Sequence, residues 1–111
     1  MKNIMEIDGH KAVISFDPNM AMFRGEFPGL SGGADFYAVD VQGLLEEGRT
    51  SLKVYLQACE ERGITPFKNF SGRFNVRISP DSHADIVTAA KTSGMSLNQW
   101  VEKALSHEAH D

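Results

Sequence analysis

The chain has 111 residues, of which 11 are basic and 15 acidic, so its formal net charge at pH 7 is −4. This length accommodates one ordinary domain or two small ones, and 41% hydrophobic residues is normal for a globular protein. The net charge excludes a protein that binds polyanions through bulk positive charge.

Two further features indicate where the protein is located. No apolar run approaches the roughly 18 residues of a membrane-spanning helix, and residues 1–8 lack the apolar core of a signal peptide. Cys59 is the single cysteine, which excludes an internal disulfide and is typical of a reducing compartment. We therefore expect a cytoplasmic protein without a membrane partner.

The first 64 residues predict a small β-β-β-α module. Alternating apolar residues and turn signals predict three strands, over residues 11–17, 20–27 and 35–39. Asp17-Pro18-Asn19 and Ser31-Gly32-Gly33 are the turn signals between them. We expect these strands to form an antiparallel meander.

A long helix should follow this sheet and lie across one of its faces. Apolar residues recur at helical spacing from Val41 to Cys59, with Asp40 as the expected N-cap and Gly63 as the expected stop. Residues 65–72 break the periodicity, and we interpret them as a linker between the module of residues 1–64 and a second domain over residues 73–109.

Residues 73–78 predict a strand with one apolar and one polar face. Because side chains alternate across a strand, three apolar residues share one face and three polar residues share the other. The apolar set is Phe74, Val76 and Ile78, and the polar set is Arg73, Asn75 and Arg77.

Two capped helices should follow this strand. Ser79-Pro80-Asp81 supplies an N-cap, a proline at the first helical position and an acidic first turn, and Gly94 is the expected helix stop. Ser96-Leu97-Asn98-Gln99 forms a capping box that opens the second helix. The buried face of that helix is predicted by residues at i, i+3, i+4, i+7 and i+8, namely Leu97, Trp100, Val101, Ala104 and Leu105.

A segment this short cannot bury its apolar face alone, and it has no cysteine or metal-ligand cluster to stabilise it. We therefore expect a dimer in which the two strands pair and four helices form a joint core. The residues expected in this core are Phe74, Val76, Ile78, Trp100 and Val101.

Strand, helix and helix in this order are the unit of a ribbon-helix-helix DNA-binding protein. The paired strands would present Arg73, Asn75 and Arg77 to base edges in the major groove of operator DNA. The amides at Ser96, Leu97 and Asn98 would hold a backbone phosphate.

Two other interpretations stay open on the residues alone. The alternating strand is also typical of an ordinary amphipathic sheet, and the ribbon could serve only to dimerise an interaction module. Four carboxylates could surround a Mg²⁺ ion in a nuclease, although each has a local structural role that explains it better. These carboxylates are Asp8, Asp17, Glu26 and Asp40.

We expect no enzyme, no metal and no cofactor. No nucleophile is indicated, because Cys59 lies on the apolar stripe of a predicted helix. His83 lies one turn before Ile86 and Val87, where a packing histidine is a better interpretation than a metal ligand.

The chain resembles HicB-family antitoxins whose C-terminal half is a ribbon-helix-helix domain, and the resemblance covers nearly its whole length. In the C-terminal half it is carried by the run Ser71-Gly72-Arg73-Phe74-Asn75-Val76-Arg77-Ile78-Ser79-Pro80, by His83 and by the run Gly94-Met95-Ser96-Leu97-Asn98-Gln99-Trp100-Val101. Upstream it is carried by Phe16-Asp17-Pro18, Phe23-Arg24-Gly25-Glu26, Phe27-Pro28-Gly29-Leu30 and Tyr55-Leu56.

This resemblance implies an α+β protein whose N-terminal module is a partial RNase H-like fold without nuclease activity. It implies that the module binds and neutralises a HicA-type mRNA-cleaving toxin, and that the C-terminal domain represses the operon encoding both proteins. It also implies a homodimer, with tetramers through the N-terminal sheet left open. The alternative is a stand-alone ribbon-helix-helix regulator whose first domain binds another protein or a ligand.

Overall fold

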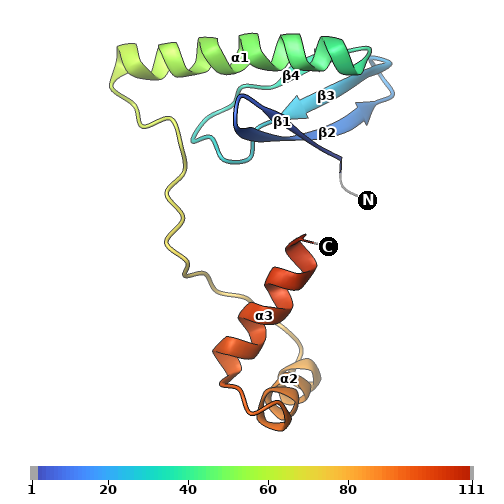
Figure 1. Cartoon of the computed structure of the whole chain (residues 1–111), viewed down its shortest axis with the longest axis vertical. Coiled ribbons are helices and arrows are strands. Elements are labelled where there is room, and N and C mark those ends of the chain that lie inside the picture. Colours follow the sequence, from blue (N-terminus) through green and yellow to red (C-terminus); the bar gives the residue numbers. More distant parts are fainter. Residues whose placement is uncertain (1–2, 111) are drawn as a thin grey trace. The chain divides into compact units, whose positions relative to one another are not determined.

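The computed structural model describes residues 3–110, which form two compact units (Figure 1). The first unit ends at Ser71 and the second begins at Gly72. The first contains a four-stranded antiparallel sheet and a long helix, and the second contains two shorter helices. The α+β class expected from the sequence is confirmed.

The sheet of the first unit is a simple meander of order β1-β2-β3-β4. Its strands are β1 (Ile4–Ile7), β2 (His10–Asp17), β3 (Met22–Glu26) and β4 (Phe36–Ala38). The last three correspond to the three predicted strands. The prediction of three strands is wrong in number, because β1 pairs with β2 along its whole length.

Strand β1 exists because Asp8 and Gly9 make a tight turn. Both residues have positive φ, 49° and 83°, which is the backbone of a two-residue type I′ hairpin. The register places Ile7 opposite His10 directly across the turn. The dipeptide Asp-Gly is the signal that could have revealed this hairpin in the sequence.

Helix α1 (Val41–Arg62) covers one face of the sheet (Figure 1). It begins and ends as predicted: the Asp40 side chain accepts a hydrogen bond from the Gly43 N–H at 2.7 Å, and Gly63 ends the helix with a φ of 65°. The core between helix and sheet contains Ile7, Phe36, Leu44 and Leu52 among its buried residues.

The second unit contains α2 (Pro80–Thr92) and α3 (Leu97–His110). The predicted caps are confirmed: the Ser79 hydroxyl accepts from the Ser82 N–H at 3.1 Å, and Gly94 takes a φ of 68° after α2. Only Ala90 is buried on these two helices as described, so the unit has almost no core of its own.

No strand is present over residues 73–78 in the single chain, contrary to the prediction. A strand needs a hydrogen-bonded neighbour, and the described part of the second unit contains no other strand. All six side chains are exposed.

The segment predicted as a linker, residues 65–72, divides in two. Phe67 forms an isolated antiparallel bridge with Leu30, so the first half of this segment packs on the first unit. The second half leads to the boundary at Gly72, whose φ of 84° suits glycine.

Candidate nucleic-acid interface

An open groove of about 920 Å³ runs along the second unit. Its walls are residues 74–78 on one side and α2 and α3 on the other. All five residues predicted for a dimer core line it, so the structure brings them together within one chain. They are Phe74, Val76, Ile78, Trp100 and Val101.

The apolar side chains of this groove are exposed in the single chain. Phe74 is 71% exposed and Val76 is 67% exposed, whereas Trp100 and Val101 are half-buried. Leu97 and Leu105 of α3 add two more exposed leucines to the same groove. A small unit that exposes so much apolar surface in one contiguous groove is typical of a protein interface.

The predicted base-reading residues lie on the same short segment. Asn75 and Arg77 line the groove together with the apolar residues, whereas Arg73 does not. In the single chain, the polar and apolar side chains of residues 73–78 therefore do not lie on opposite faces of the segment. The physical reason is that side chains alternate strictly only when the backbone is held as a paired strand.

The predicted phosphate-binding turn is a complete capping box. The Ser96 N–H donates to Gln99 Oε1 at 3.0 Å, and the Gln99 N–H donates to the Ser96 hydroxyl at 3.1 Å. The amide of Ser96 is thus already occupied. The amides of Leu97 and Asn98, in the first turn of α3, face no acceptor one turn earlier within the helix, and these two are the donors suited to a phosphate.

The four carboxylates considered for Mg²⁺ have separate structural roles. Asp17 accepts from the Asn19 N–H at 2.9 Å in the β2–β3 turn, and Asp40 caps α1. Asp8 pairs with Arg49 at 3.4 Å, and Glu26 pairs with Arg24 at 3.2 Å. Within residues 3–110, no group of three or more His, Cys, Asp or Glu side chains could hold a metal ion.

Arg24 is the centre of an ion-pair cluster on β3. Its guanidinium donates to Asp35 and to Glu26. The hydrogen bond to Asp35 and the charges of both carboxylates raise the pKa of Arg24 above its ordinary value. Tyr37 lies opposite Arg24 in the sheet register, so this cluster belongs to the sheet face that α1 does not cover.

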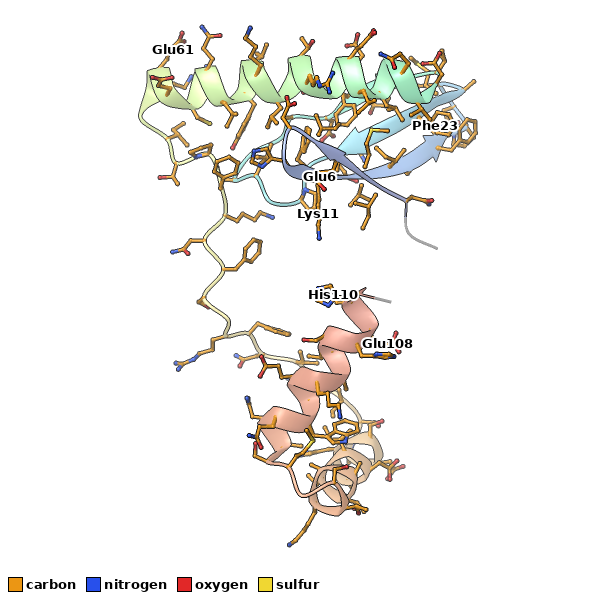
Figure 2. The ribbon with its side chains drawn as sticks, viewed as in Figure 1. Glu6, Lys11, Phe23, Glu61, Glu108 and His110 are labelled. Carbon is orange, nitrogen blue, oxygen red and sulfur yellow. The ribbon has the colours of Figure 1, made fainter. Side chains whose placement is uncertain are left out.

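That uncovered face is largely polar. Glu6 and Lys11 are register partners on β1 and β2, and Figure 2 shows both on the side of the sheet away from α1. Together with the Arg24 cluster they leave Ile4 and Val13 as the exposed apolar pair of this face. The arrangement suits a solvated surface or a polar partner better than an apolar one.

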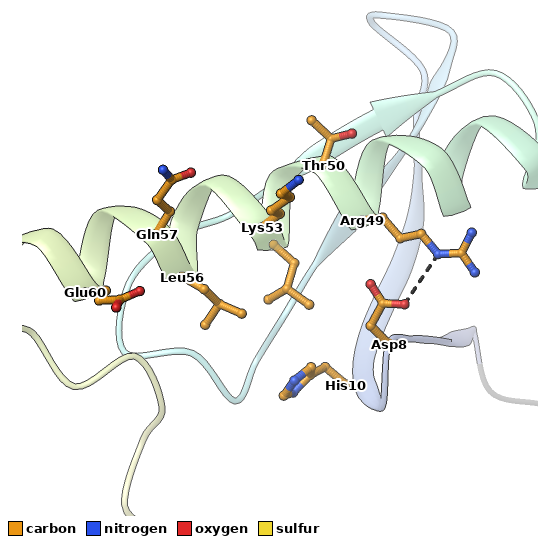
Figure 3. Close-up of a pocket in the computed structure, with 9 residues that line it drawn as sticks. Asp8, His10, Arg49, Thr50, Lys53, Leu56, Gln57 and Glu60 are labelled. Atoms are coloured by element: carbon orange, nitrogen blue, oxygen red, sulfur yellow. Dashed lines mark ion pairs between the residues drawn. The ribbon is translucent and has the colours of Figure 1, made fainter.

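A second groove, of about 720 Å³, lies between the β1–β2 turn and α1 (Figure 3). Asp8 and His10 come from the turn, and Arg49, Lys53 and Glu60 come from exposed positions of α1. Sequence reasoning missed it, because it depends on the Asp8-Gly9 hairpin. Its charges have both signs, so it indicates no particular ligand.

Cys59 and His83 are the other two residues considered for a chemical role in the sequence. Cys59 is buried on α1, as predicted for a small core residue. His83 is exposed and lines the groove of the second unit, so it does not pack in the core of the single chain. No helix within residues 3–110 is both long and apolar enough to span a membrane.

Residues 55–105 match the HicB family. The matched segment runs from the second half of α1 through the connecting residues to α3, and the sheet lies outside it. Neither the curated proteins nor the solved structures gave a significant match.

Proposed function

We propose that this HicB-type protein is the antitoxin of a type II pair, that it neutralises a HicA-type mRNA-cleaving toxin, and that it represses its own operon as a ribbon-helix-helix dimer. The first unit, a partial RNase H-like module, binds the toxin and performs no chemistry. The second unit dimerises and binds operator DNA. The HicB match over residues 55–105 supports this proposal.

The observation that carries the DNA-binding part is the groove of the second unit. Phe74, Val76 and Ile78 stand at alternate positions of one segment and are all exposed, next to two capped helices with almost no core. A second copy that pairs its own segment with this one removes these side chains from water. Full burial of each is worth about 2 kcal/mol, which is the stabilisation that the single unit lacks.

Pairing also creates the nucleic-acid surface. In a two-stranded ribbon Arg73, Asn75 and Arg77 of both chains share the outer face. Arginine can bond bidentately to guanine and asparagine to adenine. The amides of Leu97 and Asn98, at the positive end of α3, bind a flanking phosphate and fix the register of the ribbon on DNA.

The test of this surface is the double variant Asn75→Ala/Arg77→Ala in the full chain. The dimer should persist, since neither residue belongs to the apolar set, while affinity for the operator falls by a hundredfold or more, on the order expected for lost base contacts. Lys103→Ala removes the same charge from an exposed position on α3 and is the matched control.

Binding is measured by titrating labelled DNA from the gene's own promoter, with unrelated DNA as competitor. Undiminished promoter binding by the folded double variant would overturn readout by the ribbon. An equal loss of promoter affinity in the double variant and in Lys103→Ala would show that the loss comes from the removed positive charge and not from lost base contacts.

A further inference from the structure

Residues 65–68 are fastened to the first unit by a short backbone ladder. The Ser31 N–H donates to the Pro66 carbonyl at 2.9 Å, and the Lys68 N–H donates to the Gly29 carbonyl at 2.9 Å. These two hydrogen bonds flank the bridge between Leu30 and Phe67. We call residues 65–68 and their contacts with residues 29–32 the connector clasp.

Tyr55 of α1 ties the clasp to the helix. Its hydroxyl donates to the Pro66 carbonyl at 2.9 Å and accepts from the Gly32 N–H at 2.9 Å. The Ser31 hydroxyl lies 2.9 Å from the hydroxyl oxygen of Tyr55 and donates to the Thr65 carbonyl at 2.7 Å. One side chain therefore joins α1, the loop before β4 and the connector.

An aromatic contact ties the clasp to the sheet. The ring of Phe67 stacks on His10, at the start of β2, with ring centroids 5.0 Å apart and an interplanar angle of 11°. Phe67 is 39% exposed, Pro66 is half-buried, and Thr65 and Lys68 are exposed. The clasp thus adds little to the buried core, so it can open locally without unfolding the unit.

The clasp decides how much chain lies between the two units. With the clasp closed, residues 69–72 separate Lys68 from the segment that begins at Arg73, and four residues span at most about 14 Å. With the clasp open, residues 65–72 become the connection, and eight residues span at most about 29 Å. Opening therefore doubles the reach of the second unit.

We propose that the connector clasp is a releasable restraint, held by Tyr55 and Phe67, that sets the reach of the second unit from the first. It is a property of the chain itself and holds whether or not the proposed toxin and operator are the partners. If they are, a ligand that prefers one state of the clasp changes the spacing available to the DNA-binding units, because any ligand with different affinities for two states shifts their equilibrium.

The first measurement is amide hydrogen exchange on the full chain. The reporting amides are those of Ser31 and Lys68, which donate the two ladder hydrogen bonds. Tyr55→Phe keeps the ring and removes the hydroxyl, and we expect exchange at both amides to rise by about tenfold. Tyr37→Phe, on β4, removes the other tyrosine hydroxyl of the chain and should change neither amide.

The second measurement tests reach. Spin labels at Val54→Cys on α1 and Lys103→Cys on α3 report the distance between the units, with labelled chains diluted in unlabelled protein so that only distances within one chain are seen. Phe67→Ala opens the clasp by a second route and should broaden the distance distribution, as Tyr55→Phe does. Phe70→Ala is the matched control, because this exposed phenylalanine follows the clasp.

Faster exchange together with a broader distribution supports the proposal. Unchanged exchange in both Tyr55→Phe and Phe67→Ala would show that these residues do not hold the clasp. Faster exchange with an unchanged distribution would show that the clasp does not set the reach. Either result overturns the proposal and leaves the antitoxin function untouched.

Discussion

Gly25 on β3 has no room for a side chain larger than hydrogen. A Cβ at this residue would lie 2.1 Å from Cζ of Phe36, its register partner on β4, and Phe36 is itself buried. The ring thus lies directly over the glycine. The buried ring of Phe36 cannot move aside as the end of a flexible side chain could, so an added methyl group would force the backbone or the core to shift.

Gly25→Ala should therefore lower the free energy of unfolding of the first unit by about 2–3 kcal/mol, as overpacking in a dense core does. Urea unfolding followed by circular dichroism measures this. Gly33→Ala is the control, since a Cβ there meets nothing within 4 Å. Equal midpoints for the two variants would mean that Phe36 does not cover the glycine.

Ser96 tests the capping box at the start of α3. Ser96→Ala removes the acceptor of the Gln99 N–H and should cost about 1 kcal/mol of stability in the second unit. Trp100 is the only tryptophan of the chain, so its fluorescence reports the unfolding of this unit. Ser106→Ala, within α3, keeps the cap and should leave the midpoint unchanged; a similar loss in both variants would contradict the role of the box.

At the scale of elements, the groove of the second unit predicts the oligomeric state. Val76→Glu should dissociate the proposed dimer, because a charge would be buried among apolar residues of both chains. Val54→Glu is the matched control, since Val54 on α1 is 61% exposed and Val76 is 67% exposed in the single chain. Light scattering coupled to gel filtration measures the mass of each variant.

The two substitutions should affect the mass of the protein differently only if a partner chain covers one of the two valines. A surface substitution at an uncovered position usually changes stability by less than about 0.5 kcal/mol. A dimer that survives Val76→Glu as well as it survives Val54→Glu would contradict pairing through this segment.

The three helices could be predicted because their signals are local. Asp40, Ser79 and Ser96 each satisfy amides within three residues, so a single sequence contains all the information needed to place these helix starts. Strand β1 is not among the predicted strands although its turn is equally local, because four residues carry a weak alternation signal and only the Asp8-Gly9 hairpin pairs them with β2.

The strand over residues 73–78 is absent from the single chain for a different reason. Its apolar alternation is present in the sequence, but a strand is completed by a neighbour, and residues 72–110 contain no other strand. The polar and apolar side chains of this segment therefore do not lie on opposite sides, so the sequence locates the site residues in the chain but the single chain does not show which surface they share. The clasp and the groove beside Arg49 also escaped prediction, because both depend on contacts between distant residues.

At the scale of the whole molecule, charge predicts how binding to DNA depends on salt. The chain has a net charge of −4, and each protomer brings Arg73 and Arg77 to the proposed surface. If these four arginine charges displace four counterions from the DNA, the slope of log K against log salt concentration should be no steeper than about −4. Affinity measured from low to moderate salt tests this, and a slope near −10 would indicate a far more basic contact surface than the proposed one.

Neutralisation of a toxin by this chain can be measured directly. The most direct measurement mixes the full chain with the purified small protein encoded beside its gene and follows cleavage of a defined messenger RNA. We predict a stable complex and loss of cleavage at an equimolar amount of the chain. Asn75→Ala/Arg77→Ala should inhibit equally well, because the proposed role of those residues is in DNA binding. Undiminished cleavage and no complex, in the presence of a chain shown to be folded, would contradict the antitoxin role and leave only the proposed DNA-binding function.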